Sequence, residues 1–111
     1  MKRIFLIVLD SFGIGAMPDA PAFGDINVNP LATVSQSPRF STPNLQKLGL
    51  FNIDGITCGT KTPAPLARIA RMTERSAGKD TTIGHWEIAG VASQTPLPVY
   101  PHGFPEEILS A

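Results

Sequence analysis

The sequence predicts an α/β domain with a mostly parallel sheet and covering helices. Residues Ile4 to Leu9 form a continuously apolar run of strand-forming residues. A strand that is apolar on both faces is typical of the middle of a parallel sheet covered by helices. Helix signals with capping residues occur farther along the chain, and its 111 residues suffice for one small domain.

Composition and charge exclude several classes of protein. Lys and Arg together number 9 and Asp and Glu also number 9, so the formal net charge is zero. Proteins that bind nucleic acid or a membrane surface normally carry a basic excess. The single cysteine, Cys58, excludes an internal disulfide framework, and the apolar run over 4–9 is too short to span a membrane. We therefore expect a cytoplasmic protein with no nucleic-acid or membrane partner.

The chain between the apolar run and residue 66 is dominated by loops. Ala16 to Ser41 are polar and rich in Gly and Pro, which predicts a long surface loop with a short helical turn around Pro30 to Val34. Ser41 to Gly49 carry a helix signal, in which Thr42 caps, Pro follows at the first position and Gly ends the helix. Leu50 to Leu66 return to a loop pattern.

Three further elements are expected in the remainder. Ala67 to Met72 predict a short strand. Asp80 or Thr81 is expected to cap a helix that runs to Ala89 and is closed by Gly90. Residues Phe104 to Ala111 open like a helix, with an early proline and two acidic residues in the first turn. That helix ends without an exit signal, so we interpret the chain as cut there.

Asp10 is the first candidate for chemistry, because it stands at the carboxyl end of the predicted strand. In parallel sheets ligands gather beyond these strand ends, and a carboxylate there can bind a divalent metal. Aspartate also commonly caps turns with a bond from its side chain to the backbone. The local pattern leaves both interpretations open.

The second candidate is the stretch from Lys79 to Glu87. A threonine hydroxyl at the first turn of a helix lies beside backbone N–H groups and the positive end of the helix dipole, which favour an anion. Thr81 is therefore a candidate nucleophile for a phosphoryl group, or simply the helix cap. Lys79, Asp80 and His85 are the candidates for binding the phosphate.

Several blocks of this sequence resemble the phosphopentomutase family of the alkaline phosphatase superfamily. The matching blocks occur in the family's order and span essentially the whole chain: Arg3 to Asp19, Phe23-Gly24-Asp25, Pro43 to Leu50, Gly78-Lys79-Asp80-Thr81, Gly84 to Gly90 and Gly103-Phe104-Pro105. The combination of Lys-Asp-Thr with Gly-His-Trp-Glu is highly specific. The resemblance favours the functional interpretation of both candidates.

The resemblance implies an isomerase that moves a phosphoryl group within a pentose phosphate. Members of this family interconvert ribose or deoxyribose 1-phosphate and 5-phosphate through a phosphothreonine, with two manganese ions. By position, Thr81 is expected to carry the phosphoryl group and Asp10 to be an early ligand of the manganese pair. The expected fold is an alkaline-phosphatase-like core.

The family's chains run to several hundred residues, and their other metal ligands lie in the carboxyl-terminal part of the core. We therefore expect residues 1–111 to be the amino-terminal part of the metal-binding core domain, without the cap domain, and to be inactive alone. One alternative is a relative of the cofactor-independent phosphoglycerate mutases, although their nucleophile is a serine. Another is a non-catalytic module that binds a sugar phosphate or a partner.

Overall fold

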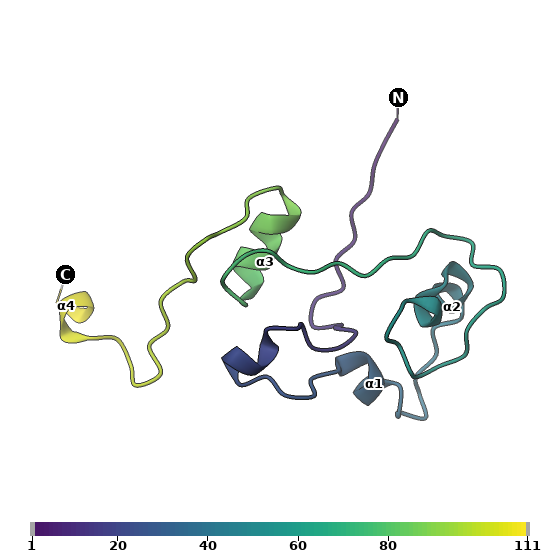
Figure 1. Cartoon of the computed structure of the whole chain (residues 1–111), viewed down its shortest axis with the longest axis horizontal. Coiled ribbons are helices and arrows are strands. Elements are labelled where there is room, and N and C mark those ends of the chain that lie inside the picture. The colour runs from purple at the N-terminus through teal and green to yellow at the C-terminus, as the bar shows by residue number, and fades with distance from the viewer. Residues whose placement is uncertain (1, 111) are drawn as a thin grey trace. The chain divides into compact units, whose positions relative to one another are not determined.

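The computed structural model describes residues 2–110, which fall into two compact units, Met1–Met72 and Thr73–Ala111. Short helices joined by long loops make up both units (Figure 1). The longest described helix has eight residues, and no helix in residues 2–110 is long and apolar enough to cross a membrane.

The predicted sheet is not present in the described residues, which contain helices, turns and loops. The prediction of a central strand over Ile4 to Leu9 is wrong for this structure, as is that of a strand over Ala67 to Met72. The apolar run is instead highly exposed, with Ile4 at 97%. A strand needs a neighbouring strand to pair its backbone groups, and sequence pattern alone does not supply that neighbour.

The first unit contains four short helices: η1 (Ala20–Phe23), α1 (Pro30–Val34), α2 (Pro43–Leu48) and η2 (Leu50–Asn52). The helical turn predicted at Pro30 to Val34 is confirmed. It begins with a proline whose fixed φ suits the first turn, and the Asn29 side chain accepts a 3.0 Å hydrogen bond from the Ala32 backbone N–H. The sequence pattern did not predict the single turns η1 and η2.

Helix α2 follows the predicted start and stop signals. Pro43 occupies its first position, and Gly49 ends it in the left-handed conformation with φ 109°. Thr42 stands at the cap position, but its side chain makes no capping hydrogen bond, so that detail of the prediction is wrong. The proline and the glycine determine the bounds of this helix by their backbone preferences.

The core of the first unit forms where α1 and η2 bring apolar side chains together. Leu31, Phe51 and Ile56 are buried, and partly buried apolar residues surround them: Phe12, Ile14, Phe40, Leu50, Ile53 and Cys58. The rings of Phe40 and Phe51 meet edge to face with centroids 6.4 Å apart. Gly59 covers the ring of Phe51 so closely that a β-carbon there would lie 2.3 Å from its Cδ1.

We expect Gly59→Ala to lower the free energy of unfolding by about 2–4 kcal/mol, because φ is +70° and the added carbon meets a buried ring. Gly24→Ala is the matched control, since Gly24 has a similar φ of +79° and nothing within 4 Å of the added carbon. Urea unfolding followed by circular dichroism measures both losses. Equal losses in the two variants would contradict this packing of Gly59 on Phe51.

The second unit contains α3 (Thr81–Ile88) and α4 (Glu106–Leu109), both close to their predicted ranges. Asp80 caps α3, because its carboxylate accepts a 3.0 Å hydrogen bond from the Ile83 backbone N–H. Gly90 lies beyond the helix at φ 98° and donates its N–H to the Glu87 carbonyl at 2.9 Å. Ile83 is fully buried and forms the centre of this small unit.

Candidate functional site

Thr81 is the first residue of α3, and its side chain lies at the exposed end of the helix. The neighbouring Asp80 caps the helix: its carboxylate accepts from the Ile83 N–H, and its carbonyl accepts the first hydrogen bond of the helix, from the Gly84 N–H, at 3.0 Å. Of the two candidate caps, Asp80 therefore holds the role. Thr81 belongs to the first turn of α3, whose first backbone N–H groups have no carbonyl partner within the helix.

The turn before α3 packs tightly against it. Gly78 is buried, and a β-carbon there would lie 2.2 Å from Cδ1 of Ile83. The Lys79 ammonium donates to the Glu74 carboxylate at 3.1 Å and to the Ser76 carbonyl at 3.3 Å. Lys79 is therefore an ion-pair partner within this turn, two residues before the candidate nucleophile.

Glu87 is a residue whose structural role the sequence reasoning missed. Its carboxylate accepts hydrogen bonds from the Arg75 N–H at 2.8 Å, the Ser76 N–H at 2.7 Å and the Ser76 hydroxyl. A glutamate six residues after Thr81 carries no sequence signal for these bonds, because its partners precede the helix.

These hydrogen bonds, chiefly the one from the Ser76 hydroxyl and next the one from the Arg75 backbone, lower the pKa of the Glu87 carboxyl below its ordinary value. A lowered folded-state pKa means that the charged carboxylate stabilises the fold at pH values above the ordinary glutamate pKa. That contribution is lost as the pH falls through the lowered pKa.

His85 lies one helical turn after the candidate nucleophile. Its Nδ1 is 2.7 Å from the Thr81 carbonyl oxygen, so this ring nitrogen carries the proton and donates it to the carbonyl. The imidazole is exposed and has Nε2 as its second nitrogen. The structure therefore brings His85 and Thr81 together on one face of α3, as their spacing of four residues requires.

Asp10 belongs to the first unit and follows the exposed apolar run. It lies in a turn closed by a 3.3 Å hydrogen bond from the Phe12 N–H to the Leu9 carbonyl, with Ser11 at φ 57°. Among residues 2–110, no three His, Cys, Asp or Glu side chains gather where they could hold a metal ion. The assignment of Asp10 as a metal ligand stays a prediction.

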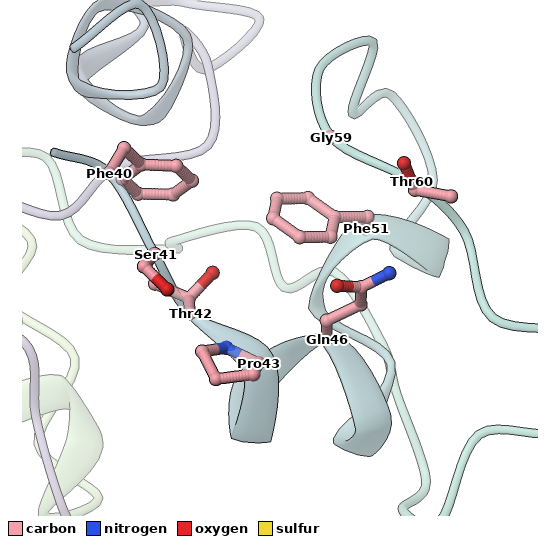
Figure 2. Close-up of a pocket in the computed structure, with 8 residues that line it drawn as sticks. All are labelled: Phe40, Ser41, Thr42, Pro43, Gln46, Phe51, Gly59 and Thr60. Carbon is pink, nitrogen blue, oxygen red and sulfur yellow. The ribbon is translucent and has the colours of Figure 1, made fainter. Parts of the chain in front are cut away.

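A separate pocket of about 260 Å³ opens beside α2 in the first unit. Figure 2 shows the rings of Phe40 and Phe51 opposite each other, with the hydroxyl and amide groups of other lining residues around them. None of the residues that the sequence singled out for chemistry is in its lining: Phe40, Ser41, Thr42, Pro43, Gln46, Phe51, Gly59 and Thr60.

Comparison with known proteins finds close relatives for almost the whole chain. It is 58% identical over 110 residues to a phosphopentomutase of Lachnoclostridium phytofermentans, a match that covers 98% of this chain and 28% of that protein. A phosphopentomutase of Acetivibrio thermocellus is 54% identical with the same coverage. One of Alkaliphilus oremlandii is 48% identical over 99% of this chain and 28% of the relative.

The chain thus spans about 28% of the length of the curated relatives that it matches. No protein-family model matches it. The identities of 48 to 58% extend across both units, so the resemblance to phosphopentomutases recognised from the sequence blocks is confirmed.

Proposed function

We propose that the chain belongs to the phosphopentomutase family, whose members it resembles over almost its whole length. We propose further that it supplies the phosphoryl-carrying threonine of an isomerase acting on ribose and deoxyribose phosphates. One observation carries this proposal. Thr81 begins an eight-residue helix whose capping role is filled by Asp80. As the first residue of α3, Thr81 belongs to the helix end where backbone N–H groups and the positive end of the dipole favour a phosphate.

The proposed chemistry is a transfer in two balanced steps. In the first step the free sugar hydroxyl attacks phosphorus, the bond between phosphorus and the Thr81 oxygen breaks, and the proton of the sugar hydroxyl passes to the Thr81 oxygen. The sugar then carries two phosphates. In the second step the Thr81 hydroxyl attacks the phosphate that the sugar carried at the start, the bond from that phosphorus to the sugar oxygen breaks, and the threonine proton passes to the sugar oxygen. The phosphoryl group has moved between positions 1 and 5, and the enzyme is phosphorylated again.

We propose that manganese is the cofactor and that Asp10 is one of its oxygen ligands. A divalent ion beside a hydroxyl lowers its pKa and makes it a better nucleophile. Each such ion takes about six ligands, so one carboxylate from this chain is a small part of the site. We assign no step of the transfer to Asp10 itself.

We also propose that the apolar run of Ile4 to Leu9 is a strand of an alkaline-phosphatase-like sheet in a protein of the relatives' length. Its exposure supports this proposal, because six consecutive apolar residues are exposed in this chain. Pairing and covering them would remove this surface from water, which is favourable by roughly 25 cal/mol per Å² of apolar area. The cytoplasm is the proposed location of that protein.

A chimera tests the proposed function. It joins this chain to the portion of the Lachnoclostridium phytofermentans phosphopentomutase that the match leaves uncovered. We expect the chimera, after chelation and addition of manganese, to convert ribose 5-phosphate to ribose 1-phosphate at a rate comparable to that of the relative. A folded chimera without turnover would contradict the proposal and favour a non-catalytic module.

A further inference from the structure

The Glu87 carboxylate ties the second half of α3 to the segment that precedes the helix. It accepts from two consecutive backbone N–H groups, those of Arg75 and Ser76, and from the Ser76 hydroxyl. Hydrogen bonds to a charged acceptor are stronger than neutral ones. Here the two carboxylate oxygens accept from the N–H groups of two consecutive residues. The segment is therefore held against α3 from the helix side.

Ser76 also connects this segment to the chain that follows α3. It is 3% exposed, and its hydroxyl oxygen accepts the Ser93 N–H at 3.1 Å. The Ala77 N–H in turn donates to the Ser93 carbonyl at 2.9 Å. The segment before α3 is thus bound on one side by Glu87 and on the other by the chain that follows the helix.

These hydrogen bonds to Ser76 hold the start of α3 close to the segment that precedes the helix. From the clamped Ser76 only a few residues lead to Thr81, and the buried Gly78 is packed on Ile83 along the way. Glu87 lies six residues after Thr81, a rise of about 9 Å along the helix. Its carboxylate is fully engaged with the segment, so it acts on Thr81 through the backbone.

We propose that Glu87, through Ser76, is a positioning residue that holds the turn carrying Thr81 in place for phosphoryl transfer. This inference rests on the proposed function of Thr81. A misplacement of about 1 Å can cost about a hundredfold in rate, so a clamp on this turn bears directly on turnover.

Glu87→Gln in the chimera tests this inference, because it keeps the size of the side chain and replaces one acceptor oxygen with a donating NH₂ group. We expect the amides of Arg75 and Ser76 to exchange hydrogen about tenfold faster or more. We also expect kcat to fall about 10- to 100-fold with KM nearly unchanged. The matched control is Glu107→Gln, the same change at an exposed glutamate on α4, which should leave both quantities unaltered.

A double-variant comparison separates positioning from general loss of structure. If Glu87 acts through Ser76, then Glu87→Gln combined with Ser76→Ala should lower kcat by less than the product of the two single losses. The inference would be overturned if the kcat loss of the double variant equalled the product of the two single losses. It would also be overturned if amide hydrogen exchange became uniformly faster across the protein. Unchanged exchange at residues 75 and 76 would overturn it as well. These exchange rates do not depend on turnover, whereas failure of the proposed function would appear as full activity after loss of the Thr81 hydroxyl.

Discussion

Thr81→Ala in the chimera is expected to abolish interconversion of the ribose phosphates, with turnover reduced about a thousandfold or more. The alanine has no oxygen to carry the phosphoryl group, so covalent labelling of the protein should also disappear. The fold should be almost unaffected, because Asp80 rather than Thr81 caps α3. We expect the free energy of unfolding to change by less than about 0.5 kcal/mol.

Thr82→Ala is the matched control for this experiment. Thr82 is the next residue of the same helix, also exposed, and its loss removes an identical hydroxyl. Turnover, intact-protein mass before and after incubation with substrate, and thermal unfolding should be measured for both variants. Near-normal turnover in Thr81→Ala, or loss of labelling only in Thr82→Ala, would show that Thr81 is not the phosphoryl carrier.

The chain by itself is expected to give no measurable conversion of ribose 5-phosphate, with or without added manganese. Asp10 and Thr81 offer one carboxylate and one hydroxyl, whereas two divalent ions require about six ligands each. A single carboxylate competes poorly with the hydration shell of such an ion, so manganese should bind weakly. The exposed run of Ile4 to Leu9 should also make the isolated chain prone to self-association.

A coupled assay on the purified chain, followed by manganese titration calorimetry, measures both expectations. The chimera under the same conditions is the positive control. Turnover by the isolated chain that persists after contaminating enzyme is removed would contradict the prediction. Tight binding of two manganese ions would do the same, because it would mean that these residues contain a complete metal site.

Local chemistry explains why several elements were predicted well. The bounds of α1 were predicted as observed, since Pro30 suits a first turn and Asn29 caps it. The proline at the start of α2 and Gly49 at its end have intrinsic backbone preferences that few neighbours can override. The Asp80 cap of α3 is equally local, because its partner is the backbone of Ile83.

Contacts between distant residues were not predictable in this way. The side chain of Asn52 binds the peptide of Thr62 through two hydrogen bonds of 2.8 and 2.9 Å, across ten residues of loop. Glu87 reaches back to Arg75 and Ser76 in a similar manner. Asparagine and glutamate are common on protein surfaces, and nothing in their spacing indicates which backbone groups the folded chain will bring to them.

The amino-acid sequence alone indicated the resemblance to phosphopentomutases, the helices α1, α2 and α3, and the candidate residues Asp10 and Thr81, because motifs and capping residues act over a few neighbours. The tertiary structure decided how Glu87 holds the turn that precedes α3. It also decided the state of Ile4 to Leu9, which are exposed instead of forming a central strand. The residue pattern of a strand specifies only which of its side chains can be buried. Pairing of its backbone groups depends on a partner strand that the fold brings beside it.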